Sequence, residues 1–194
     1  MRKSTLSLAV LLACLYLTSC APVIVGRTPQ PAAPEEWEFS INAGYPSNFD
    51  QPIAQPANLF LSRGVGGNTE VNGTLFLSQA YGLRLGGKTL LVDGMVPIAV
   101  DYGVFLPFNI GVDAGLLLSY PQPGVEPYGA LRGFVTGVLN GEGYGTSVVG
   151  ALTVGADIPA GGGNFFMEVT AHTTRTYYDP PFGFAIVPAL GYRF

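Results

Sequence analysis

Residues 108–119 read FNIGVDAGLLLS, and every second position of this stretch, from Phe108 to Leu118, is apolar. The positions between them are small or polar, except for Leu117. Successive side chains of a β-strand point to opposite faces. The period of two therefore predicts a strand with one oily face and one face of small or polar side chains.

The same alternation recurs along the chain, with clusters of glycine, proline and asparagine between the runs and no apolar stripe of helical period. It predicts strands at 36–46, 71–86, 94–106, 108–120, 127–139, 146–158, 164–176 and 182–194. This makes eight strands, with 47–70 as a long first loop. The motif Leu59-Phe60-Leu61-Ser62 echoes residues 75–78 and indicates a further strand, so ten strands is the alternative count.

The amino-acid composition indicates whether the oily face of the predicted strands is in contact with lipid or lies inside a soluble protein. Only 11% of the 194 residues are charged and 27 are glycine, which excludes a disordered acidic chain, a coiled coil and a basic nucleic-acid binder. The second face of the strands lacks the long charged side chains that a soluble sheet needs. Small side chains suit a narrow barrel lumen, and the oily face then meets lipid. Residues 36–194 are therefore predicted to form a closed antiparallel up-and-down transmembrane β-barrel.

The last strand carries a recognisable pattern. Leu190, Tyr192 and the terminal Phe194 alternate along it, and this resembles the closing strand of bacterial outer-membrane β-barrels. The resemblance implies that these three residues are a signal for the barrel-assembly machinery. Pro188 departs from the pattern, because a residue without an N–H weakens the ladder where the barrel must close.

The first residues have the features of an export signal. A cationic start precedes an apolar run at 6–17 that is too short to span a bilayer, so residues 1–19 are predicted to be a signal peptide. The sequence Leu17-Thr18-Ser19-Cys20 resembles the lipobox of bacterial lipoproteins. That resemblance implies acylation of Cys20 by the lipoprotein-export machinery and location in the outer membrane of a diderm bacterium. Ordinary cleavage nearby is the alternative. Residues 20–35, with four spaced prolines, are predicted to be an extended tether.

Charged residues on the small-residue face are candidates for a polar network in the lumen: Arg84, Asp101, Asp113, Asp157, Glu168 and Arg193. A cation pathway is one interpretation, and a paired network that fills a narrow bore is the favoured one. Without the signal peptide, seven basic and thirteen acidic residues leave a formal charge of −6, which argues against nucleic-acid binding. One histidine and one cysteine predict no metal site, and nothing indicates a cofactor.

Catalysis is the remaining hypothesis. His172, Glu168 and Thr174 share one strand face, and His172-Thr173-Thr174 is similar to the His-x-Ser pair of outer-membrane lipid A deacylases, with threonine in place of serine. The sequence favours a non-enzymatic outer-membrane barrel, in contact with membrane lipid, that serves envelope structure, adhesion or surface interaction. The alternatives are a barrel enzyme that acts on lipid, and a lipid-anchored soluble barrel that binds an apolar ligand.

Overall fold

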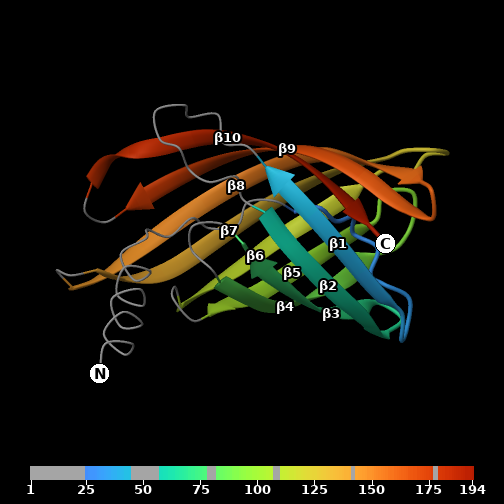
Figure 1. Ribbon diagram of the computed structural model, residues 1–194, viewed down its shortest axis with the longest axis horizontal. Helices are drawn as coiled ribbons and strands as arrows, with labels where there is room; N and C mark the ends of the chain where they lie inside the picture. The colour runs from blue at the N-terminus through green and yellow to red at the C-terminus, as the bar shows by residue number, and fades with distance from the viewer. Residues whose placement is uncertain (1–24, 45–56, 78–81, 107–109, 141–142, 177–178) are drawn as a thin grey trace, which may run out of the picture.

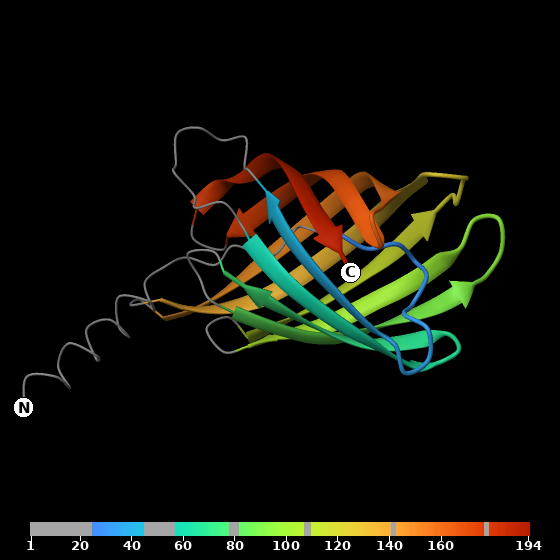
Figure 2. The ribbon, with the colours of Figure 1, turned by 45° about the vertical axis from the view of Figure 1, so that its right-hand side comes forward.

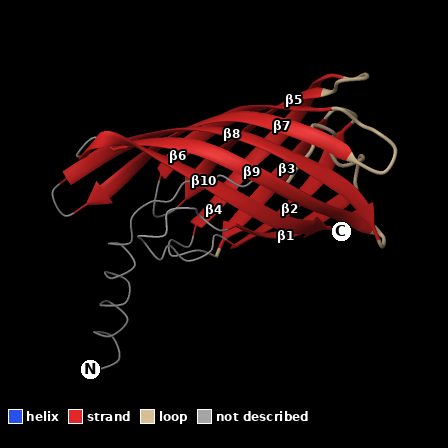
Figure 3. Cartoon of the chain, turned by 90° about the horizontal axis from the view of Figure 1, so that it is seen from above, coloured by secondary structure: helices blue, strands red, loops and turns tan. Residues whose placement is uncertain are grey.

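The structure is a computed structural model that describes residues 25–44, 57–77, 82–106, 110–140, 143–176 and 179–194. Within these ranges ten antiparallel strands close into one barrel (Figure 1), and loops connect them (Figure 3). The strands are β1 (Trp37–Gly44), β2 (Ala57–Gly66), β3 (Thr69–Phe76), β4 (Gly82–Val92), β5 (Ile98–Leu106), β6 (Ile110–Ser119), β7 (Glu126–Asn140), β8 (Gly143–Ala160), β9 (Gly163–Thr176) and β10 (Asp179–Arg193). Each strand pairs with its sequence neighbours, and β1 pairs with β10. The predicted closed up-and-down barrel is confirmed, with ten strands instead of eight.

The strand count differs from eight at the start of the barrel. β2 lies within 47–70, the range predicted to be a loop, and the predicted strand 71–86 is divided between β3 and β4. Phe60 on β2 and Phe76 on β3 point inward and are buried. Each of these aromatic side chains stands between two leucines, and Arg63, Thr69 and Gly73 occupy outward positions of the two strands. The period of two is therefore hidden there. Residues 47–56 lie outside the described ranges.

The two ends of the barrel differ. At one end β2 connects to β3, β4 to β5, β6 to β7 and β8 to β9 by short turns, and Trp37 and Phe194 lie there as well. We call this the turn end. The opposite end, where β1 ends and β2 begins, is the loop end. These names are used below to give depth within the lumen.

The predicted direction of the oily face is confirmed. Outward side chains such as Ile110, Leu131 and Val154 are 63%, 61% and 59% exposed, whereas inward Ser40 and Asp101 are at most 1% exposed. Among the outward strand side chains that the structure describes, Arg63 is the single charged one. It lies near the turn end, with its guanidinium 5.4 Å from the centre of the Trp37 ring. The barrel is therefore apolar outside and polar inside, the reverse of a soluble barrel.

The closing seam accommodates its proline. β1 and β10 pair from Ser40↔Arg193 to Gly44↔Ala189. Pro188 lies one residue beyond the last of these pairs and faces Val169 of β9 on its other side. The weakening predicted from its missing N–H therefore falls outside the β1–β10 ladder that the structure describes.

An outward charge is expected to destabilise the barrel according to its depth. Leu61 lies in the middle of β2 and Val65 lies near the turn end of the same strand, and both point outward. Leu61→Arg is expected to lower the free energy of unfolding by about 2–4 kcal/mol, and Val65→Arg by about 0–1 kcal/mol, because an arginine near a membrane interface keeps its hydration. Urea titration in phospholipid vesicles measures both values. Equal losses at the two positions would contradict a lipid-facing exterior.

Candidate functional site

The lumen contains ten buried charged side chains, five basic and five acidic. The basic residues are Arg27, Arg84, Lys88, Arg132 and Arg193, and the acidic residues are Glu70, Asp101, Asp113, Asp157 and Glu168. A charge removed from water is tolerated only when it is paired and hydrogen-bonded. Among the described residues, nine of the ten form ion pairs, and Glu168 is held by backbone N–H groups and a tyrosine hydroxyl.

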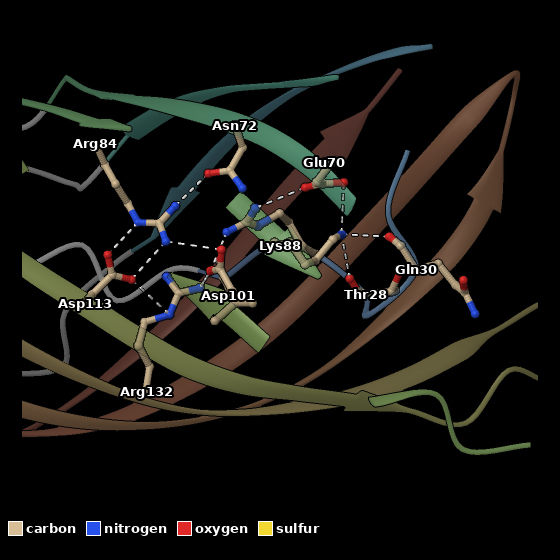
Figure 4. A network of polar contacts seen from close by, with 12 residues as sticks. Thr28, Gln30, Glu70, Asn72, Arg84, Lys88, Asp101, Asp113 and Arg132 are labelled. Carbon is tan, nitrogen blue, oxygen red and sulfur yellow. Dashed lines mark hydrogen bonds and ion pairs between the residues drawn. The ribbon is translucent and has the colours of Figure 1, made fainter. Parts of the chain in front are cut away.

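Arg84, from β4, is the centre of this network (Figure 4). Its Nε donates to Asp113 Oδ1 at 2.8 Å, its Nη1 to Asn72 Oδ1 at 2.8 Å, and its Nη2 to Asp113 Oδ2 at 3.0 Å and Asp101 Oδ1 at 3.2 Å. A Cβ at Gly103 would lie 2.7 Å from the Arg84 guanidinium. The glycine therefore leaves the space in which the guanidinium lies against the wall.

Asp101, from β5, joins three cations. Besides Arg84, it accepts hydrogen bonds from Arg132 of β7 and, at 2.6 Å, from Arg27 Nη2. Arg132 also approaches Asp113, with 3.8 Å between its Nε and Asp113 Oδ2. The carboxylate of Asp101 thus links side chains of β4 and β7 to residue 27, which precedes the first strand.

Residues 25–34, which we call the N-terminal segment, lie inside the lumen. The sequence predicts an extended tether over 20–35, and the trace that precedes β1 runs from the turn end into the interior (Figure 2). Arg27, Thr28, Pro29 and Ala32 are all buried there. The spaced prolines do keep this segment out of the sheet. The reason for its position is the set of wall charges that its backbone and its arginine satisfy.

Three charged wall residues hold the backbone of the N-terminal segment. Glu168 of β9 accepts from Val25 N at 2.7 Å and from Gly26 N at 2.8 Å. Glu70 of β3 accepts from the N–H of residue 32 at 2.9 Å. Lys88 of β4 donates to the carbonyl oxygens of residues 28 and 30, at 3.0 and 2.7 Å (Figure 4).

The side chain of Arg27 completes the attachment. Its Nη1 lies 3.3 Å from Glu70 Oε1, its Nη2 binds Asp101, and its guanidinium lies 4.4 Å from the centre of the Phe60 ring. Charge-assisted hydrogen bonds and a desolvated cation–π contact are among the stronger polar interactions in proteins. Arg27 is therefore the main side-chain anchor of the segment.

Two glycines make room for the N-terminal segment. A Cβ on Gly64 of β2 would overlap the carbonyl oxygens of Ala32 and Ala33. Gly26 has φ of 55°, and a Cβ there would lie 2.7 Å from Phe166 Cζ. Wall and segment therefore fit each other closely.

Beyond the network, on the side of the loop end, the lumen is filled by aromatic side chains. The ring centres of Phe76 and Phe105 are 6.2 Å apart, and those of Phe105 and Phe134 are 6.0 Å apart. A cavity between Val25, Phe76 and Arg132 has a volume of about 10 Å³. That is room for about one water molecule. The described residues therefore leave no wide aqueous path at this depth.

The six residues predicted for the lumen network are all buried inside the barrel. Arg84, Asp101 and Asp113 meet in one cluster. Asp157 pairs with Arg193 and also accepts from Asn164 Nδ2 at 2.7 Å. Glu168 binds the N-terminal segment and, at 2.7 Å, the Tyr128 hydroxyl.

Sequence reasoning missed four charged members of the network: Arg27, Glu70, Lys88 and Arg132. Arg132 could have been found, because it has the same parity as the buried Phe134 on one predicted strand. Glu70 and Lys88 lie just outside the predicted strand 71–86. Arg27 belongs to a segment without periodicity, so no pattern in the sequence could have placed it in the lumen.

The candidate catalytic residues are not brought together. Both carboxylate oxygens of Glu168 are occupied by the N-terminal segment and Tyr128. The buried Nδ1 of His172 has no hydrogen-bond partner among the described residues. The side chain of Thr174 lies outside the described part of the structure. The described residues also contain no group of three or more potential metal ligands.

The predicted assembly signal lies at the turn end. Phe194 is 64% exposed, and its ring centre lies 4.7 Å from that of Tyr192 and 5.9 Å from that of Phe39. Leu190 points outward on the same strand and is 55% exposed. Its role in assembly stays a prediction, as does acylation of Cys20, because residues 1–24 are outside the described ranges.

Comparisons with known proteins identify a fold. No protein-family model and no curated protein matches the chain. Among solved structures, the NanC porin is similar over 80% of this chain and 98% of that chain, with a TM-score of 0.56 at 10% identity. The KdgM porin aligns with 81% of this chain and 98% of its own, at 7% identity and a TM-score of 0.44. The N-terminal β-barrel domain of OprF from Pseudomonas aeruginosa aligns with 83% and 98%, at 11% identity and a TM-score of 0.35. The chain has the barrel fold of the NanC porin. No helix among its described residues is long and apolar enough to cross a bilayer.

Removal of one network member is expected to be costly. Arg84→Met leaves Asp113 with only the distant Arg132 and is expected to lower the free energy of unfolding by about 3–5 kcal/mol. The double variant Arg84→Met/Asp113→Leu removes one charge of each sign and is expected to recover most of that loss. Urea titration of the refolded variants in detergent measures both effects. Additive losses in the double variant would show that charge pairing does not stabilise the lumen.

Proposed function

We propose that this chain is a non-enzymatic, integral outer-membrane β-barrel whose filled lumen gives it a role in envelope structure or surface contact. The observation that carries this proposal is the distribution of charge. The described outward face of the strands has one charged residue, Arg63, whereas ten charges are buried inside. A hydrocarbon surrounding favours that arrangement, because exposed apolar side chains are unfavourable in water, and the charges turned away from the hydrocarbon are paired inside.

The exterior argues against a lipid-anchored soluble barrel. Such a barrel would need an apolar interior for its ligand and a polar surface for water. Here the interior contains the ion pairs of Asp101 and Asp157, and the exterior contains outward residues such as Leu118 and Leu152, which are 51% and 56% exposed. The barrel fold shared with the NanC porin supports the same location.

The interior supports a structural role over an open conduit. Arg84 and Arg132 join Asp101 and Asp113 inside the lumen along β4 to β7, and the N-terminal segment occupies the half nearest the turn end. A lumen filled in this way serves as a rigid support for the loop end. Loops at that end are then the part of the protein that would contact molecules outside the membrane.

Membrane integration is expected to be independent of the acyl chain. A Cys20→Ser chain should remain in the membrane pellet after extraction with alkaline sodium carbonate, because the barrel exterior is held by hydrocarbon. A control lipoprotein with a soluble domain, stripped of its acylated cysteine, should be released under the same conditions. Release of the Cys20→Ser chain would refute integration of the barrel.

The lipid-modifying alternative has its own test. His172→Ala is expected to leave lipid A unchanged, because Glu168, the acid on the same strand face, is bound to the N-terminal segment and to Tyr128. Mass spectrometry of lipid A from cells that express the wild-type chain, the variant or neither makes the comparison. Loss of one acyl chain with the wild-type protein only would establish the enzyme and refute the proposed role.

A further inference from the structure

We propose that the turn-end half of the lumen is a binding site for a short peptide that carries one arginine, with the N-terminal segment as its resident ligand. The proposed membrane role does not require this site, so the two ideas can fail separately. The site comprises Glu70, Lys88, Asp101 and Glu168, together with the ring of Phe60.

Side chains of the barrel wall bind the main chain of the N-terminal segment as well as its arginine side chain. Three N–H groups of the N-terminal segment donate to carboxylates, and two of its carbonyl oxygens accept from one ammonium group. The residues that provide these groups, Glu70, Lys88 and Glu168, lie on β3, β4 and β9. They converge only in the folded barrel. The N–H groups of residues 25, 26 and 32 and the carbonyl groups of residues 28 and 30 are main-chain groups of the kind that peptide-binding proteins hold.

The charge count explains why the ligand carries an arginine. The wall alone contributes four buried cations and five buried carboxylates. Arg27 supplies the fifth positive charge and places it between Glu70 and Asp101. Without Arg27, Glu70 keeps Lys88, and Asp101 keeps Arg84 and Arg132. The wall then has one more buried carboxylate than buried cations, which is unfavourable. A guanidinium also suits the face of Phe60, over which it stacks.

The shape of the site fits entry from the turn end. The segment leaves the lumen there at Pro34, which bridges to Gly64 of β2. Further in, the Phe76, Phe105 and Phe134 side chains fill the bore. A peptide that enters from the turn end would therefore reach Asp101 before it reaches these aromatic side chains. The spaced prolines of the segment favour an extended backbone before it binds, which reduces the entropy lost on binding.

The resident segment competes with any peptide from outside. It is joined directly to β1, so its effective concentration at the site is on the order of millimolar. A test with the full chain must therefore weaken the resident segment while leaving the wall unchanged. Arg27→Ala removes the anchor, and Gly26→Ala introduces a Cβ 2.7 Å from Phe166. Both changes lie in the segment, outside the wall.

The experiment uses a fluorescent synthetic peptide of residues 25–34 (VGRTPQPAAP) and the refolded full chain in detergent. Fluorescence anisotropy is expected to show binding at least about tenfold tighter to the Arg27→Ala and Gly26→Ala chains than to the wild-type chain. A peptide with alanine in place of its arginine should bind the weakened chains at least about tenfold less tightly. Adding Glu168→Gln to the Arg27→Ala chain should weaken binding of the native peptide.

A second measurement applies where the weakened chains do not refold. Thr28 is buried, and its side chain takes no part in the contacts above, so a Thr28→Cys chain without native cysteines reports release of the segment. The native peptide should accelerate maleimide labelling of this cysteine in proportion to its concentration, and the alanine peptide should not. Equal binding of both peptides by the weakened chains, or a labelling rate independent of the native peptide, would overturn the proposal.

Discussion

The buried carboxylate of Asp101 determines how the charged side chains inside this barrel are arranged. Its two carboxylate oxygens meet guanidinium groups from β4, from β7 and from the N-terminal segment. A carboxylate inside a lumen without bulk water is tolerated only with such partners. Each of these guanidinium groups also pairs with a second acid, Glu70 or Asp113, so the ion pairs extend from β3 to β7. The positions of Arg84, Arg132 and Arg27 follow from this one requirement.

The same requirement explains why the sequence is poor in charge and rich in glycine. The described outward face of the strands carries one charge, that of Arg63, so the other described charges that the strands carry are directed inward and must be matched there. Long cations need space in a narrow bore, and positions such as Gly103 and Gly64 supply it. The glycines therefore reflect the size of the inward arginines and the presence of the N-terminal segment more than any freedom of the backbone.

Sequence reasoning predicted the features that repeat along the chain. On β5 and β6, the outward residues are apolar and the inward residues are mostly small or acidic, with Phe105 and Leu117 as exceptions. The fold and the direction of the oily face could therefore both be inferred. On β2 and β3, inward Phe60 and Phe76 obscure the alternation, and the count of strands was uncertain there. The position of Arg27 could not be predicted from the sequence. It depends on the excess of buried carboxylates over buried cations on the wall, which exists only after distant strands have come together. Long-range complementarity of this kind has no signature in a local pattern.

The location of residues 25–34 has a consequence for the order of assembly. The ring closes where β1 meets β10, and the segment that leads directly into β1 is enclosed by that ring. Once all neighbouring strands are paired, a chain cannot enter the closed barrel through its wall. The segment must then be in place before β1 and β10 pair, or be threaded into the lumen through an open end of the barrel. Residues 25–34 are thereby tied to the step in which β1 and β10 pair and close the barrel.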